Sequence, residues 1–176
     1  MIALLPWIGL AFASPVVTVE SASLQLPSGV AVSVGTATAS EGTVRGEGVQ
    51  ARQGDLVISA DSTEWALNGS KGTFDGNVRA VQGDLTFSCD RVEVELGADG
   101  SIRNARATGR VSVVQGPRTA QGQRATFADG RLVLSGDPVV RQGLNEMAGR
   151  EIIFVVGRDT IECIACTMKL KGELHQ

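Results

Sequence analysis

The side chains that could support metal or redox chemistry are three cysteines and one histidine. Cys163 and Cys166 form a Cys-x-x-Cys pair, Cys89 is isolated, and His175 is the only histidine. A structural zinc site needs four ligands, and a thioredoxin-type centre needs a βαβ context that this sequence lacks. Positions three apart in a strand face opposite sides, so a disulfide between Cys163 and Cys166 would require a turn. We interpret the cysteines as structural residues, leave one disulfide open, and predict no metal site and no cofactor.

The carboxylates do not form a catalytic pattern either. Glu93 and Glu95 lie two residues apart, on what we expect to be the solvent face of a strand. A single histidine supports no Ser-His-Asp or Cys-His arrangement, and no glycine-rich loop precedes a helix. The sequence therefore predicts a protein that is not an enzyme.

Composition and charge favour a β-rich protein without a nucleic-acid partner. The net charge is −3, and acidic and basic residues are interspersed, without the basic run that a nucleic-acid footprint needs. Val, Ala, Leu and Ile supply most of the apolar volume, and 22 glycines interrupt it. Because β-branched residues suit strands and glycine breaks helices, we expect many short strands.

The first thirteen residues resemble a targeting segment. Residues 2–12 form an apolar run, and Ala11-Phe12-Ala13 matches the small-residue pattern of a cleavage site. The run is shorter than the roughly 20 apolar residues that span a bilayer. We predict a probable signal peptide over residues 1–13 and export of the remainder, with an uncleaved anchor as the alternative.

A short motif recurs four times and defines the elements that must position any site. Each copy has a glycine, a stretch with Val, and Gln-Gly, and the Gln-Gly pairs stand at 53–54, 82–83, 115–116 and 142–143. Spacings of 29, 33 and 27 residues are typical of stacked supersecondary units. Strict alternation of apolar and polar residues, as over 91–96, predicts antiparallel strands with one buried and one solvated face.

Turn dipeptides separate the predicted strands. We expect tight hairpin turns at Asn68-Gly69, Asp75-Gly76, Asp99-Gly100 and Asp129-Gly130, and further reversals at Gly54-Asp55 and Gly83-Asp84. Four such units give about sixteen short antiparallel strands in a single domain over residues 14–176. Residues 16–46 are looser, and we expect a degenerate capping turn there.

Four segments together resemble a known family. Residues 76–94, 107–111, 120–127 and 130–140 are similar to the OstA-like domain of lipopolysaccharide transport proteins, the LptA type, which LptC and the N-terminal domain of LptD share. The resemblance is best over residues 46–156. It implies an all-β fold, a twisted open β-jellyroll, and a periplasmic protein that binds and transports lipopolysaccharide (lipid A), shielding its acyl chains in an apolar groove and bridging the inner and outer membranes. It also implies LptC-like and LptD-like partners and head-to-tail homo-oligomers, all through edge-strand addition.

Alternation within the matching segments gives the expected groove lining. The lipid-binding residues would be Val78, Ala80, Leu85, Phe87, Val92, Val94, Val111, Val113, Phe127, Leu132, Leu134, Ile152 and Phe154. Two other functions remain open. One is an LptC-like component of the same pathway, anchored in the inner membrane by the leading segment. The other is a structural β-solenoid with a filled interior and no ligand.

Overall fold

The structure is a computed structural model that describes residues 17–25, 30–40, 42–66, 69–155, 158 and 160–170. The signal peptide predicted over residues 1–13 and His175 lie outside these described residues. Inside them, no helix is long and apolar enough to cross a bilayer.

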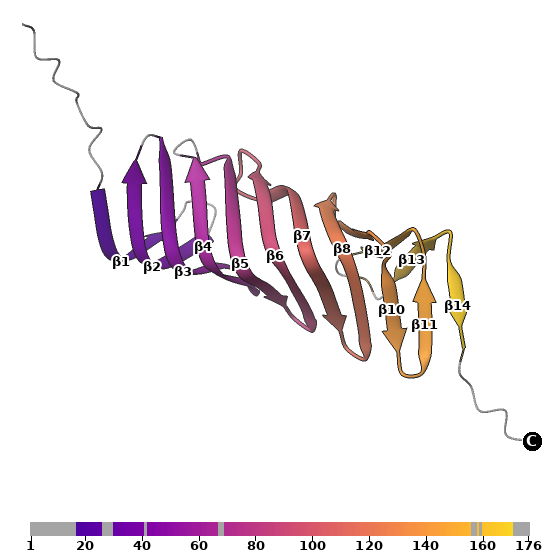
Figure 1. Ribbon diagram of the computed structural model, residues 1–176. Coiled ribbons are helices and arrows are strands. Elements are labelled where there is room, and N and C mark those ends of the chain that lie inside the picture. Colours follow the sequence, from indigo (N-terminus) through magenta and orange to yellow (C-terminus); the bar gives the residue numbers. More distant parts are fainter. Residues whose placement is uncertain are drawn as a thin grey trace, which may run out of the picture.

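The described strands form one antiparallel sheet of 14 strands, which confirms the predicted all-β fold (Figure 1). The first eight strands lie side by side in chain order. They are β1 (Val17–Gln25), β2 (Val30–Ser40), β3 (Thr43–Gln53), β4 (Leu56–Ala66), β5 (Lys71–Gln82), β6 (Leu85–Leu96), β7 (Ile102–Gln115) and β8 (Arg118–Ala128).

After β8 the sheet continues as two branches, because β8 pairs with two shorter strands. The second half of β8 (residues 124–128) pairs with β9 (Arg131–Ser135), followed by β12 (Glu151–Val155) and β13 (Ile161–Ile164). The first half (residues 118–121) pairs, along the same edge, with β10 (Val139–Gln142), followed by β11 (Asn145–Ala148) and β14 (Thr167–Lys169).

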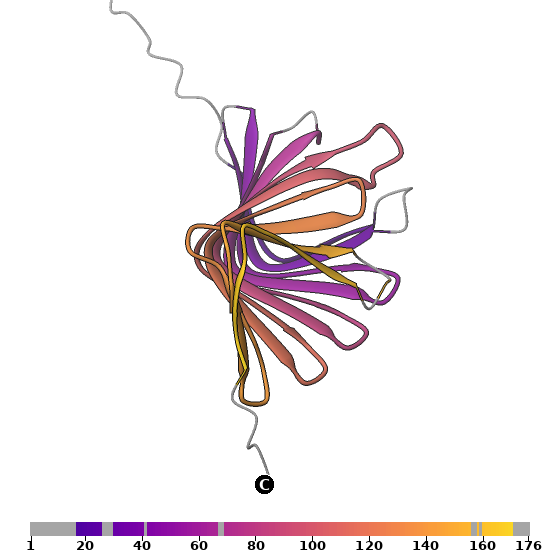
Figure 2. The ribbon, with the colours of Figure 1, turned by 90° about the vertical axis from the view of Figure 1, so that its right-hand side faces the viewer.

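The long strands bend near their middle, so the sheet folds into two diverging arms with a common bend (Figure 2). We call the arm that contains β9, β12 and β13 the β9 arm. It also includes residues 36–40, 43–47, 62–66, 71–75, 91–96, 102–108 and 124–128 of the long strands. The β10 arm contains β10, β11 and β14, together with residues 49–60, 78–89 and 111–122.

β-Bulges produce the bend. The pairing of β5 with β6 shifts register between Asp75 and Val78, and the pairing of β7 with β8 shifts between Thr108 and Val111. Both shifts contain a glycine and a polar residue with positive φ, namely Gly76-Asn77 and Gly109-Arg110. A bulge adds a residue to one strand and bends it, so the strand passes from one arm to the other without ending.

The prediction of a hairpin turn at Asp75-Gly76 is therefore wrong. These residues lie inside β5, at its bulge. Asp-Gly supplies positive φ equally well to a two-residue turn and to a bulge, so the dipeptide alone cannot distinguish them. Turns do occur at Gly54-Asp55, Gly83-Asp84, Asp99-Gly100 and Asp129-Gly130. Of Asn68-Gly69, only Gly69 is described, and it has positive φ.

The same finding explains why 14 strands are described instead of about sixteen short ones. Segments that the sequence analysis separated by a corner belong to one continuous strand, as in β5 to β8, which are 11 to 14 residues long. Residues 16–46 were expected to form a degenerate cap. Their described part forms β1, β2 and the start of β3, which pair regularly with one another.

Inward-facing residues on the β9 arm form rows that cross the strands, and their size changes along each row. The row next to the bend starts with small side chains and ends with large ones: Ala37, Gly46, Thr63, Phe74, Val92, Ala107, Ala125, Leu134 and Ile152. Small inward side chains leave space between the arms, and large ones fill it. The interior is therefore wide near β2 to β4 and packed near β9 and β12.

Gly109→Ala should destabilise the protein more than Gly116→Ala, although both glycines have positive φ. A Cβ at Gly109 would overlap the Asp90 carboxylate, whereas a Cβ at Gly116, in a hairpin turn, would meet nothing within 4 Å. We expect Gly116→Ala to lower the free energy of unfolding by about 1 kcal/mol from the left-handed backbone alone. Gly109→Ala should lower it by about 2–4 kcal/mol. Urea unfolding of both variants measures the difference, and equal losses would contradict a tightly packed bulge.

Candidate functional site

The larger of two apolar spaces between the arms lies near the N-terminal end of the stack. It has a volume of about 540 Å³ and is lined from β1 to β7. Its lining is mostly aliphatic, with Val32, Val34, Val44, Ile58 and Ile102 among the contributors, together with Trp65 and Phe74. We call it the wide cavity. Ala37, on β2, carries only a methyl group, which leaves part of this space open. Val34 packs over Gly46, where a Cβ would lie 2.6 Å from the Val34 Cγ1 atom.

A second apolar space continues from the wide cavity toward β9. It has a volume of about 160 Å³ and is lined from β4 to β9, and we call it the narrow cavity. The two cavities share five lining residues: Leu56, Ile58, Phe74, Val94 and Ile102. Together they form a groove that runs across the strands, between the two arms.

The interior beyond the narrow cavity is filled. Leu134 and Ile152 are both 0% exposed, and Val111 and Val113 are 1% exposed. These side chains come from both arms and belong to one cluster of buried apolar residues, as in an ordinary hydrophobic core. The groove therefore narrows from the N-terminal strands and ends before β12.

All thirteen residues expected to line the groove point inward, because each belongs to the buried core or packs against it. Eight of them line the narrow cavity: Val78, Ala80, Leu85, Phe87, Val92, Val94, Phe127 and Leu132. Val94 also lines the wide cavity. The other five contribute to the filled part of the interior and line neither cavity: Val111, Val113, Leu134, Ile152 and Phe154.

Sequence reasoning missed most of the wide cavity. Val32 and Val34 were recognised as part of a strand but were assigned to a degenerate cap. Ile58 stands in Leu56-Val57-Ile58, where three consecutive apolar residues hide the alternation. Trp65 faces inward beside Gly72, and a Cβ at Gly72 would overlap its ring. The alternation over residues 30–34 was the one signal that could have extended the predicted lining toward β2.

The groove is almost free of charge. Among the described residues that line the two cavities, Arg52 is the only one with an ionisable side chain. This lining offers no pair of acid and base groups for catalysis, and it excludes water from an apolar chain. The site is therefore suited to holding an apolar ligand.

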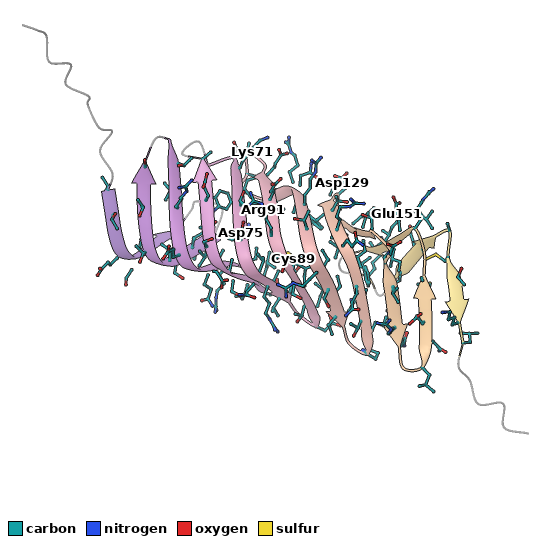
Figure 3. The ribbon with its side chains drawn as sticks, viewed as in Figure 1. Lys71, Asp75, Cys89, Arg91, Asp129 and Glu151 are labelled. Atoms are coloured by element: carbon teal, nitrogen blue, oxygen red, sulfur yellow. A yellow bond between two sulfur atoms is a disulfide. The ribbon has the colours of Figure 1, made fainter. Side chains whose placement is uncertain are left out.

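Charged residues gather instead on the outer faces, where they pair across strands. Arg45 pairs with Glu64, and Lys71 pairs with Glu95, each at 2.7 Å, while Arg91 donates to Asp75 at 2.5 Å (Figure 3). The hydrogen bond and charge of Lys71 lower the pKa of Glu95. These side chains are well exposed, so solvent and salt screen the pairs and each adds little to stability. The expectation that Glu93 and Glu95 lie on the solvated face agrees with this arrangement.

The cysteines form one disulfide and leave one thiol. Cys163 and Cys166 are joined by a disulfide that connects the end of β13 to the start of β14. Ala165, between them, has a φ of 54°, which provides the turn that this pairing requires. Cys89 is free and lies in the core. The described residues contain no group of three or more His, Cys, Asp or Glu side chains that could hold a metal ion.

Comparison with known proteins identifies the class of protein that this sheet and groove define. A family described as "LptA/(LptD N-terminal domain) LPS transport protein" matches residues 57–159, more than half of the chain. The chain belongs to this family. The match runs from β4 to the end of β12, and it confirms the resemblance inferred from the sequence.

A solved structure has the same fold. It is LptH of Pseudomonas aeruginosa, described as the LptA homologous periplasmic component of the conserved lipopolysaccharide transport device. The TM-score is 0.58 at 18% sequence identity, and the alignment covers 66% of this chain and 95% of that one. No curated protein matches the sequence.

Cys89 should resist alkylation in the folded protein. Burial raises the pKa of its thiol to about 12, and the nearby Asp90 charge adds to this effect, so the reactive thiolate is scarce at neutral pH. The raised pKa also means that stability should fall as the pH rises from about 9 toward 12, because the unfolded thiol ionises first. Mass spectrometry after iodoacetamide treatment at pH 8 should show modification of Cys89 only in denaturant. Rapid labelling of the native protein would contradict this burial.

Proposed function

We propose that this protein is a periplasmic lipopolysaccharide carrier that holds acyl chains in the groove between its two arms. Membership of a lipopolysaccharide transport family supports the transport role. The observation that carries the binding role is a mostly aliphatic groove with Arg52 as the one ionisable residue among its described lining and a wide part of about 540 Å³. Each methylene transferred from water into such a lining gains about 0.8 kcal/mol, so an acyl chain is retained by several kcal/mol.

The groove also separates the carrier from a ligand-free structural rod. A rod needs an interior that is packed along its whole length, and among the described residues the fullest packing lies near β9 and β12, where Leu134 and Ile152 are fully buried. Near β2 to β4, the interior instead contains the wide cavity. This contrast favours the carrier.

The ends of the sheet support partner binding by strand addition. Among the described strands, β1 pairs only with β2, β13 only with β12, and β14 only with β11. Each end therefore presents unpaired backbone groups, which are templates for another strand. We propose that LptC-like and LptD-like proteins add at these edges, and that copies of this chain associate head to tail in the same way.

Ile58→Glu should prevent lipid binding, whereas Val57→Glu should not. Ile58 lines both cavities, and Val57 is its neighbour on the opposite face of β4. Both side chains are half-buried, so the two variants carry similar risks to folding. A carboxylate in the groove would have to be desolvated by an acyl chain, which opposes binding.

The measurement is mass spectrometry of lipid that co-purifies with each protein from a lipopolysaccharide-producing envelope. We expect at least a tenfold loss of lipid for Ile58→Glu and near wild-type loading for Val57→Glu, with unchanged β-type circular dichroism for both. Equal loading of the two variants, or no lipid with the wild type, would overturn the carrier proposal.

Proline at one of two adjacent positions in β1, Thr18 or Val19, should weaken self-association. Val19 is 48% exposed on this edge strand. Successive residues of an antiparallel strand direct their backbone groups to opposite neighbours, so either Thr18 or Val19 directs its N–H away from β2. Proline at that position removes a donor from the free edge while leaving the pairing of β1 with β2 intact.

Sedimentation velocity over a concentration series, with thermal unfolding as the control, tests this proposal. We expect one of Thr18→Pro and Val19→Pro to lower self-association about tenfold at an unchanged melting temperature, and the other to lower the melting temperature. A wild-type protein that stays monomeric at all concentrations would overturn head-to-tail assembly.

A further inference from the structure

One aromatic side chain lies where the wide and narrow cavities meet. Phe74, on β5, lines both cavities and is 3% exposed. In its row of inward residues, Gly46 and Thr63 precede it, and Val92, Ala107 and Ala125 follow it. Phe74 is therefore the one large side chain in this part of the row, with smaller side chains on both sides of it.

Neighbouring residues hold Phe74 in place. The Trp65 ring meets it edge to face, with the ring centroids 5.9 Å apart and the planes at 84°. Trp65 lies over Gly72, where any Cβ would overlap the indole ring. The hydroxyl of Thr63 donates a hydrogen bond to the carbonyl oxygen of Thr73 at 2.8 Å, which fixes β4 against β5 directly beside Phe74. Edge-to-face aromatic contacts and buried hydrogen bonds both restrict side-chain and backbone movement.

We propose that Phe74, supported by Trp65, is a partition that limits how far an acyl chain extends from the wide cavity toward the narrow one. This inference rests on the proposed function and adds a residue that determines specificity. A chain that ends before Phe74 is buried along its whole length, and a longer chain leaves its last methylenes outside the lining. Phe74 then sets the chain length at which the affinity stops increasing.

The test uses the full chain and a series of saturated fatty acids as probes, with calorimetry to measure each dissociation constant. In the wild type, we expect the affinity to increase about fourfold per methylene, from roughly 8 carbons upward, and then to level off. Phe74→Leu removes part of the partition and should move the plateau to longer chains. Phe154→Leu is the matched control, because Phe154 is also 3% exposed and lines neither cavity.

The possible results distinguish the two proposals. A plateau that moves in Phe74→Leu but not in Phe154→Leu supports the partition. An identical plateau in the wild type and both variants overturns the partition and leaves the lipid groove intact. A wild type that binds no fatty acid of any length overturns the groove itself. If Phe74→Leu does not fold, Phe74→Met replaces the rigid ring with a smaller, flexible side chain that fills irregular gaps, and the same shift is expected.

Discussion

The bend inside each long strand is the constraint on which the groove depends. A flat sheet of this length would expose one apolar face, whereas a bent sheet buries that face against itself. The bend requires a bulge with positive φ, as at Gly76-Asn77 and Gly109-Arg110. Glycine is needed there for a second reason, because Asp61 and Asp90 pack where a Cβ would stand. The bulges thus set the angle between the arms and the space between them.

Residue size along the inward rows then divides this space. The same backbone arrangement is hollow where the row carries Gly46 and Thr63, and packed where it carries Leu134 and Ile152. Van der Waals contacts and apolar burial in the packed part stabilise the strands around it, including the short β9, β10 and β12. The filled end therefore supplies stability that the open end cannot supply. One sheet in this way combines a hollow part, the proposed binding site, with a core.

The sequence predicted the faces of the strands but not the distance between the arms. Alternation was enough to assign Val78, Phe87 and Leu132 to the inward face, since the side-chain period of a strand is two. Whether an inward residue lines a cavity depends on the side chains of the facing arm. The periodicity of a single strand gives no information about those side chains. Leu134 and Leu132 look alike in the sequence, yet Leu132 lines the narrow cavity and Leu134 is completely enclosed. The bulge at Gly76 was missed for a similar reason. A bulge is defined by how β5 pairs with β6, and the sequence of β5 alone does not give that pairing.

The filled end also restricts the route that an acyl chain can take through the molecule. A chain that continued along the groove past Phe74 would reach Leu134 and Ile152, both without exposed surface. Inserting methylenes into such packing costs about 1–3 kcal/mol, which offsets the gain of about 0.8 kcal/mol from each methylene buried. The opening between the free ends of the arms carries no comparable cost, since the wide cavity is lined there by partly exposed residues such as Gln53 and Ala66. For the proposed carrier, entry and exit near the N-terminal strands are therefore favoured over passage along the whole stack.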